Sequence, residues 1–507
     1  MTGTLPSSRV RSGLLAAALM VATFAAYSPA LRAVWVWDDW AIFRNPLLSG
    51  FDGLINIWTR PSANANEVHY WPLTYTVFWI INQVAGMKPA AFHFVNVALH
   101  ASNAVLLWLL LRRLAISGAW FAAAVFALHP VRVESVAWCI ELKDVLSGFF
   151  YLAAFLLYQI SIDGRHRWQP AYFAALACFA MSLLSKSVGV TLPVALLIVA
   201  WWRDGRLTRP VVMRTLPFFV MALLIVGADL LVVGQLEKNS VALTTAVRVI
   251  VAGRAFWFYL SKLLWPMELS AVYPAWIINA REWWLYLYPA ATALFLLRLV
   301  MARRTIGRAP GAAFLFYAIT LAPTLGFVPF SFMRVSWVAD RFQYLAAIGP
   351  LTLAVGGAAW ALRNASPSLR RTATGGAIVV CALLGVLTWR QAATWRNVQT
   401  LFEQAARVAP DSPVVHHNLG DAALSTNRPA EAVTYYTRVM QLEPAYTRGH
   451  VLLGDSLRAL RKSAEAVRQY RIALRLDPDN AAARDGLRKL LSSGDHLTTP
   501  PEWEHKP

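Results

Sequence analysis

The sequence predicts an all-α protein: a polytopic membrane helical bundle followed by an α-solenoid of short helical repeats. Three observations predict this fold class. First, 57% of the 507 residues are hydrophobic and only 15% are charged, whereas soluble domains carry about 25% charged residues. Second, apolar stretches of about 20 residues, the length that crosses a membrane, recur along the chain. Third, these stretches stop near residue 395, where a 34-residue repeat begins.

About eleven stretches are predicted to span the membrane. They lie near residues 13–34, 92–111, 117–137, 143–160, 169–185, 187–202, 213–234, 284–301, 311–330, 343–362 and 374–393. One further apolar segment, 247–265, is interpreted as interfacial or re-entrant. A span at that point would move the basic loop "MARRTIGR" to the opposite side of the membrane from the other basic loops.

The basic residues determine the predicted orientation. A net charge of +20 would suggest nucleic-acid binding in a soluble protein, but here the arginines and lysines lie in short loops after alternate spans. The positive-inside rule makes these loops cytoplasmic. The N-terminus is then cytoplasmic, and residues 35–91 and those after about 394 face outward. The lack of organellar signals and the short repeat domain favour a bacterial inner membrane with a periplasmic repeat domain.

Several positions near the C-terminus repeat together every 34 residues, which is the tetratricopeptide period. The repeating pairs are Gly420 and Gly454, Ala432 and Ala466, and Tyr436 and Tyr470. The predicted domains are a membrane body over 1–393, a tetratricopeptide-repeat domain with a capping helix over 394–493, and a disordered tail over 494–507. Such repeats bind peptides and proteins, so any chemistry is expected in the membrane body.

Asp38 and Asp39 are the first candidates for that chemistry. They stand in "WVWDDW", directly after the first predicted span, and tryptophans favour the boundary between lipid and water. One carboxyl group of a close pair can have a raised pKa, which suits a general base. The alternative is that the pair only marks the end of the span and caps the following helix.

The second predicted span carries four polar residues on one helix face. They are His93, Asn96, His100 and Asn103, spaced by three or four residues. The asparagines are expected to bond to neighbouring helices, whereas His93, near the outer end, is expected to line the site. The two histidines are about 10 Å apart along the helix axis, too far to share one metal ion.

Charged residues at the outer ends of other spans complete the candidate site. Glu134 and Asp144 lie in or beside the turn "HPVRVESVAWCIELKD", and Lys186 follows in "LLSKS". Arg334 and Arg341 lie in "FMRVSWVADRF", on the side where arginines are not expected. An anionic lipid head group is one reason to place them there, because arginine binds phosphate with a fork of two donors. No residue set has the spacing of metal ligands.

Taken together, these motifs resemble the transmembrane and tetratricopeptide-repeat-containing (TMTC) proteins of the GT-C glycosyltransferase superfamily. The resemblance covers nearly the whole chain. It depends on the order of "WDDWAIFRNP", "YWPLTYTVFWIIN", "FHFVNVALH", "HPVRVESVAW", "KDVLSG", "LLSKSVGVTLP" and "ADRFQYLAAIG", followed by the repeats. The chain departs from the pattern in two places: relatives often carry an acid where Ser187 stands, and eukaryotic members have longer repeat arrays.

The resemblance implies a GT-C-like body that transfers a sugar, mannose in eukaryotic members, from a polyprenyl-phosphate carrier to a hydroxyl acceptor. The acidic residue of the first outer loop is the catalytic group of that pattern, and it corresponds to Asp38 or Asp39. The expected substrates are a lipid-linked sugar and an acceptor polypeptide bound by the repeats, with inversion at the sugar carbon. Participation of a divalent metal is left open.

Two other functions remain alternatives at this point. The chain could modify a lipid or a cell-envelope glycan with the same chemistry. It could also be a membrane scaffold with protein-binding repeats, although a scaffold does not require outer arginines or acids that enter spans.

Overall fold

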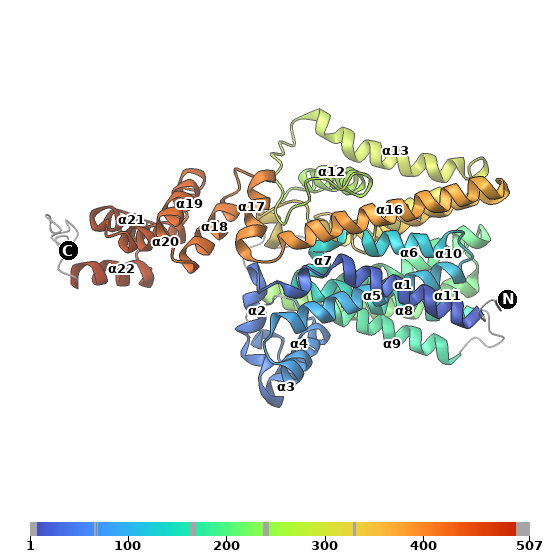
Figure 1. The fold of residues 1–507 in the computed structure, drawn as a ribbon, viewed down its shortest axis with the longest axis horizontal. Coiled ribbons are helices and arrows are strands. Elements are labelled where there is room, and N and C mark those ends of the chain that lie inside the picture. The colour runs from blue at the N-terminus through green and yellow to red at the C-terminus, as the bar shows by residue number, and fades with distance from the viewer. Residues whose placement is uncertain are drawn as a thin grey trace, which may run out of the picture. The chain divides into compact units, whose positions relative to one another are not determined.

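The computed structural model describes residues 8–64, 67, 69–162, 169–236, 243–327 and 331–492, and all regular elements within these ranges are helices (Figure 1). The predicted disordered tail lies outside the described residues. The chain forms two compact units. The first, the membrane body, comprises residues 1–269 and 276–396, and the second, the repeat unit, comprises 270–275 and 397–507. The predicted all-helical fold class is confirmed.

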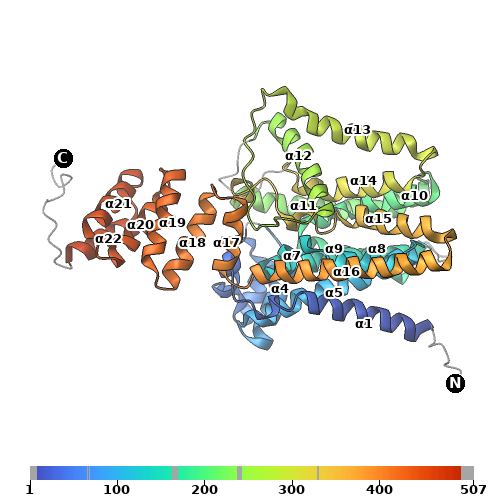
Figure 2. The same cartoon turned by 45° about the horizontal axis from the view of Figure 1, so that its top comes forward.

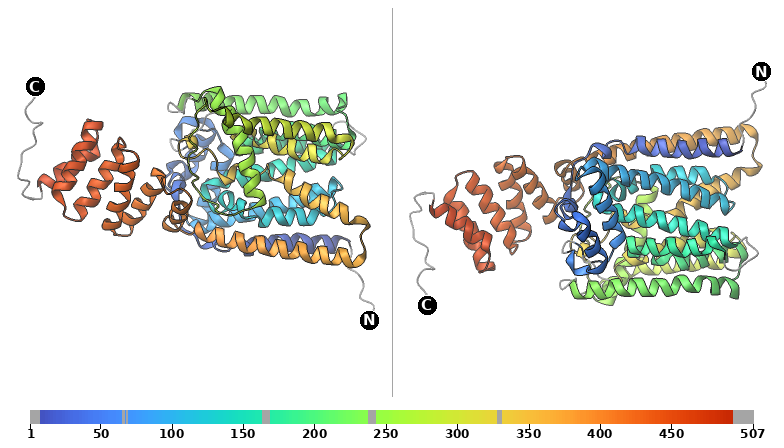
Figure 3. Two further views of the ribbon diagram at one scale, coloured as in Figure 1. Left: turned by 90° about the horizontal axis from the view of Figure 1, so that it is seen from above. Right: turned by 90° about the horizontal axis from the view of Figure 1, so that it is seen from below.

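Eleven helices of the described body correspond to the eleven predicted spans. Seven of them lie in segments long and apolar enough to cross a membrane: α1 (Ser8–Ala26), α5 (Pro89–Arg113), α8 (Leu142–Ile162), α10 (Leu192–Asp204), α11 (Arg209–Leu236), α13 (Leu287–Met301) and α16 (Pro367–Thr394). The other four are shorter: α6 (Ala119–Leu128), α9 (Pro170–Ser185), α14 (Ala309–Leu321) and α15 (Ile348–Ala361). Most of them lie side by side along one common axis, with neighbours running up and down it (Figures 1 and 3).

Three predicted spans were wrong at their C-terminal ends, and a proline explains each error. The first span was predicted to reach residue 34, but α1 ends at Ala26, just before Pro29. Similarly, α6 ends at Leu128 and α14 at Leu321, before Pro130 and Pro323. Proline lacks a backbone N–H, so it cannot donate the hydrogen bond that would continue the α-helix. The polar segments therefore begin earlier in the chain than hydrophobicity alone predicts.

Helix α12 (Thr245–Leu264) crosses the direction of the other body helices (Figures 1 and 2). It packs closely on the start of α13, since a Cβ atom added at Gly253 would lie 2.4 Å from the backbone nitrogen of Pro289. This orientation agrees with the interpretation of 247–265 as an interfacial or re-entrant segment.

The short elements of the body gather at one end of the bundle (Figure 1). They include α2 (Trp40–Phe43), α3 (Gly50–Thr59), α4 (Pro72–Ala85) and α7 (Val133–Ala137). At this end α1, α9 and α16 finish and α5 and α8 begin. We call it the charged end, because the acidic and basic residues predicted to form the site meet here.

The repeat unit consists of six helices in sequence. They form two complete repeats, α18 (Pro413–Ser425) with α19 (Pro429–Leu442) and α20 (Thr447–Ala459) with α21 (Ser463–Leu476), flanked by α17 (Val398–Val408) before them and α22 (Ala481–Ser492) after them. Each repeated glycine packs against a repeated tyrosine. A Cβ atom at Gly420 would lie 2.7 Å from the ring of Tyr436, and one at Gly454 would lie 2.7 Å from the ring of Tyr470. Only glycine lets the tyrosine ring pack against the helix backbone there.

Candidate active site

The two adjacent aspartates have different environments. A short 3₁₀ turn, Trp37–Asp39, holds both. Asp39 is fully buried, and its two carboxylate oxygens accept backbone N–H groups of Val36 and Ile140, each at 2.9 Å. Asp38 is exposed, close enough to Lys143 and Arg341 to interact with their positive charges. Asp39 therefore joins two loops, whereas Asp38 is open to a substrate.

Burial also separates the two acids chemically. It raises the pKa of Asp39 to about 8, although the two backbone N–H groups act in the opposite direction. A carboxyl group that is neutral near pH 7 and has both oxygens occupied is a poor proton acceptor. Desolvation also raises the pKa of Asp38, but Lys143 and Arg341 act in the opposite direction, and among the described residues no backbone N–H group of another loop is bonded to its exposed carboxylate in the way that Ile140 is bonded to Asp39.

Aromatic packing fixes the turn that presents Asp38. The ring of Trp37 stacks on Trp138 with 4.8 Å between ring centroids and 4° between planes. Trp37 has a positive φ of 47°, a conformation that costs a non-glycine residue roughly 1–3 kcal/mol. Trp35 packs inside the protein against Phe92, and of the three tryptophans only Trp40 is largely exposed. The predicted tryptophan belt at the lipid boundary is therefore mostly a set of internal contacts.

Glu141 is the centre of a buried charge cluster beside this turn. Its carboxylate lies 3.3 Å from Nε of Arg341, 3.2 Å from Nζ of Lys186 and 3.7 Å from Nζ of Lys143. Sequence reasoning placed Glu141 and Lys143 in the correct turn but did not choose them as site residues. Three cations around one carboxylate come from three separate segments, and spacing along the chain does not reveal that convergence.

Two further carboxylates complete the cluster, and both were predicted. Glu134 accepts the backbone N–H of Arg341 at 3.0 Å and pairs with the guanidinium of the same residue. Asp144 lies 2.5 Å from Nζ of Lys186 and accepts the hydroxyl of Ser135 at 3.0 Å. These side chains are 3–12% exposed.

The neighbouring carboxylates stabilise the charged forms of Arg341 and Lys186. Burial acts to lower the pKa of Arg341, but Glu134 and Glu141 outweigh it and the pKa is raised. The pKa of Lys186 is raised for the same reason, by Asp144 and Glu141. The cluster thus keeps three positive and three negative side chains together in a site of low exposure.

A second polar set lies beside the cluster, and sequence reasoning missed it. Asp229 of α11 accepts the hydroxyl of Ser187 at 2.5 Å and the backbone N–H of Tyr70 at 2.8 Å, and it lies 3.2 Å from Nδ1 of His69. An acidic residue within an apolar span is expensive and usually functional, and that signal could have identified Asp229. Its carboxylate contacts Ser187, which directly follows Lys186 of the charge cluster.

The remaining predicted residues have different positions. Asn103 donates to the backbone oxygen of Val145 in α8 at 2.9 Å, so the predicted interhelical hydrogen bond is confirmed for Asn103, whereas Asn96 donates at 3.0 Å to the backbone oxygen of Trp138, which lies in a connection just after α7. His93 is fully buried and lies 3.4 Å from Sγ of Cys139. Arg334 is exposed, and it forms no ion pair with any residue that the structure describes. The structure therefore does not bring Arg334 into the cluster.

A small cavity of about 10 Å³ touches the cluster at Asp144, Lys186 and Arg341. This volume is close to the minimum that holds one water molecule. Across the described ranges, no three His, Cys, Asp or Glu side chains are grouped as metal ligands, since the acids of the cluster face lysines and an arginine.

Fold and site together define a helical integral membrane protein with a buried ion-pair cluster at one end of its bundle and a tetratricopeptide-repeat domain. The tetratricopeptide-repeat family model matches residues 414–446. Curated relatives that match 78–88% of this chain carry protein O-mannosyl-transferase names, most of them TMTC names, which confirms the resemblance predicted from the motifs.

Three relatives illustrate the match. Drosophila melanogaster protein O-mannosyl-transferase Tmtc3 is 23% identical, over 88% of this chain and 58% of its own length. Human protein O-mannosyl-transferase TMTC4 is 26% identical, over 79% of this chain and 63% of its own length. Mouse protein O-mannosyl-transferase TMTC1 is 33% identical over 37% of this chain and 22% of its own. This chain thus spans 58–63% of the length of the first two relatives.

Among solved structures, the mycobacterial arabinofuranosyltransferase AftD aligns with 77% of this chain and 27% of its own length. The identity is 15% and the TM-score is 0.43.

Proposed function

We propose that this protein is a membrane glycosyltransferase that moves a hexose, mannose by analogy with its relatives' names, from a polyprenyl-phosphate carrier to a hydroxyl group. The acceptor is a serine or threonine of a polypeptide. The observation that carries the proposal is the exposed carboxylate of Asp38 beside Lys143 and Arg341, at the end of an apolar bundle. A lipid-linked anion and a water-side hydroxyl can meet at such a boundary.

In the proposed reaction, Asp38 accepts the proton of the acceptor hydroxyl while the hydroxyl oxygen attacks the anomeric carbon. The bond between that carbon and the phosphate oxygen breaks, and its electron pair stays on the polyprenyl phosphate. Direct displacement inverts the anomeric centre. Asp39 holds the turn through its bonds to Val36 and Ile140, so that Asp38 is presented in one position.

Positive charge is needed where the leaving phosphate gains charge. Lys186 and Arg341 have close carboxylate partners. Nζ of Lys186 lies 2.5 Å from Asp144, and Nε of Arg341 lies 3.3 Å from Glu141. Lys143 is held more loosely, 3.7 Å from Glu141 and 3.9 Å from Glu67, and it lies 5.1 Å from the centroid of the Trp71 ring. We assign the first phosphate contact to Lys143, with Arg341 and Lys186 supplying the surrounding positive potential.

The repeat unit supplies acceptor binding in this proposal, because tetratricopeptide repeats bind peptides and carry no chemistry. The basic loops between spans support an orientation in which the charged end faces away from the cytoplasm, which in a bacterial inner membrane is the periplasmic side. Both assignments are part of the proposal.

Product analysis tests the function. Purified protein would be incubated with polyprenyl-phosphate mannose and a periplasmic extract, and the products separated into protein, lipid and glycan fractions. Mannose on serine or threonine with inverted configuration is the expected result. Mannose found in the lipid or glycan fraction would show that the acceptor is a lipid or an envelope glycan and not a polypeptide. Absence of transfer from any polyprenyl-phosphate sugar would refute the enzyme assignment.

A further inference from the structure

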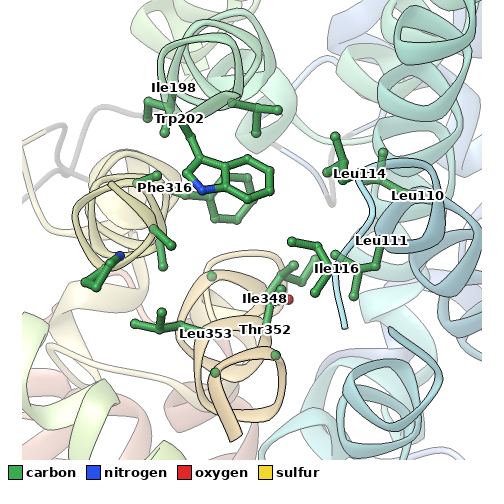
Figure 4. A pocket seen from close by; sticks show the side chains of 18 of the residues that line it. Leu110, Leu111, Leu114, Ile116, Ile198, Trp202, Phe316, Ile348, Thr352 and Leu353 are labelled. Atoms are coloured by element: carbon green, nitrogen blue, oxygen red, sulfur yellow. The ribbon is translucent and has the colours of Figure 1, made fainter. Parts of the chain in front are cut away.

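The body contains a large apolar pocket that the proposed reaction does not use. Its volume is about 670 Å³, and it lies between α5, α8, α10, α14 and α15. Figure 4 shows its walls, with Leu110 and Leu111 on one side, Trp202 and Phe316 on another, and Leu353 below. Ligand sites have volumes of about 300–1,000 Å³ and mostly apolar linings, so the pocket has the size and chemistry of a binding site.

The pocket is closed toward the charged end and open at the opposite end. Its lining residues Tyr151, Ile348 and Phe316 are at most 8% exposed, whereas Ile306 is 52% and Trp360 is 60% exposed. Ile348 begins α15 at the charged end and Trp360 lies in its last turn, so the pocket extends roughly 18 Å along the helix axis. A molecule enters it from the end remote from Asp38.

Two arginines stand at the open end. Arg308 lines the pocket, and its Nη1 donates to the backbone oxygen of Trp201 at 3.1 Å. The guanidinium of Arg363 lies over the Trp360 ring, 3.7 Å from its centroid. Neither arginine pairs with a carboxylate among the described residues. The opening therefore combines an apolar interior with positive charge that has no carboxylate partner within the part of the chain that the structure describes.

We propose that this pocket binds an anionic phospholipid from the leaflet at that end of the bundle. One acyl chain fills the apolar interior, and the phosphate contacts Arg308 and Arg363. Covering these apolar walls with an acyl chain is more favourable than leaving them in contact with water, and arginine pairs well with phosphate. The sugar donor does not fit this role, because its phosphate must reach the charged end. The inference requires a membrane but not the proposed enzyme activity.

A glycine provides a selective test. Gly357 lines the pocket, and a Cβ atom added there would meet no atom within 4 Å. Gly357→Leu should therefore obstruct the open half of the pocket without displacing its walls, and leucine also favours the helix over glycine. Gly375 of α16 is the matched control, since a Cβ atom there likewise meets nothing within 4 Å and Gly375 does not line the pocket.

The experiment is native mass spectrometry of the intact detergent-purified protein, titrated with phosphatidylglycerol or phosphatidylcholine of identical acyl chains. The wild type and Gly375→Leu should bind phosphatidylglycerol preferentially, and Gly357→Leu should lose that binding. Arg308→Gln with Arg363→Gln should weaken phosphatidylglycerol binding at least about tenfold, because a bond to a charged group contributes about 1.5–3 kcal/mol, and should leave phosphatidylcholine unchanged.

Three results would overturn the proposal. The first is equal binding of both lipids by the wild type. The second is unchanged phosphatidylglycerol binding by Gly357→Leu. The third is displacement of phosphatidylglycerol by polyprenyl phosphate in the wild type but not in Gly357→Leu, which would assign the pocket to the donor's tail.

Discussion

At the scale of single residues, the pair Asp38 and Asp39 gives the sharpest test of the mechanism. Asp38→Asn removes the proton acceptor but keeps the shape of the turn, so transfer should fall at least about 100-fold, the lower range for general-base catalysis. Thermal unfolding should stay close to that of the wild type, because the Asp38 side chain is exposed. Initial rates with polyprenyl-phosphate mannose measure the effect.

Asp39→Asn is the matched comparison. An amide keeps one acceptor oxygen where the carboxylate used two, so one buried N–H group loses its partner, at about 1–3 kcal/mol. A lower Tm with activity retained in the folded fraction is expected. The opposite pattern, with a fully active Asp38→Asn and an inactive, stable Asp39→Asn, would exchange the two roles.

The buried ion pair between Lys186 and Asp144 predicts non-additive stability. Lys186→Met leaves Asp144 buried without its 2.5 Å partner, and breaking one side of such a pair costs about 3–5 kcal/mol. The double variant with Asp144→Leu should be more stable than the sum of the single variants predicts, because no unpaired charge remains between them. Thermal unfolding of all four proteins in one detergent measures this coupling, and strict additivity would contradict it. Lys143→Met, which removes a more distant pair, should have a smaller effect.

Sequence reasoning identified most of the charged residues of this cluster, but it did not predict which residues pair with one another. Glu134, Asp144, Lys186 and Arg341 were chosen because charge is unexpected where spans end. Arg341 meets Glu134 across 207 positions of the chain, and only the packing of the helices decides that contact. Asp229 was missed for a different reason. It is a single acid inside the predicted span 213–234, and that segment was identified by its apolar residues alone.

At the scale of elements, the positions of the helices followed from hydrophobicity, whereas their ends depended on proline. The eleven predicted spans all correspond to helices, yet α1 stops well before residue 34. The sequence predicted only indirectly that α12 does not run along the bundle, because a further span at that point would have moved a basic loop to the other side of the membrane. Hydrophobicity indicates the length of the segment that can lie in the membrane, whereas proline, which lacks a backbone N–H, determines where the helix ends.

The repeat helices give a prediction at this scale. Gly420→Ala would place a Cβ atom 2.7 Å from the Tyr436 ring, and overpacking of this kind costs typically 1–3 kcal/mol. Hydrogen exchange of the full chain should increase in α18 and α19 while the body helices stay protected. Gly376→Ala in α16, where a Cβ atom meets nothing within 4 Å, should leave exchange unchanged. Equal exchange in both variants would show that the glycine–tyrosine contact does not determine the repeat.

At the scale of the whole molecule, the body and the repeat unit should separate chemistry from acceptor choice. The charged cluster lies entirely within the body, and α16 leads directly into α17 of the repeat unit. Deleting residues from Asp411 onward should therefore preserve hydrolysis of the donor, or transfer to a small hydroxyl acceptor, but lose transfer to the natural polypeptide. The measurement compares both acceptors with one enzyme preparation.

The same division requires the repeat unit to lie on the side of the membrane where the acceptor is found. If the N-terminus is cytoplasmic, as the alternating basic loops predict, an odd number of spans before residue 397 would place the repeat unit outside. A cysteine introduced at Ser425, in the last turn of α18, should react with an impermeant maleimide once the outer membrane is opened. The variant should have all three native cysteines, Cys139, Cys178 and Cys381, replaced. Labelling by a permeant reagent alone would place the repeats in the cytoplasm, and a cytoplasmic repeat unit could not select an acceptor for Asp38 on the outer side.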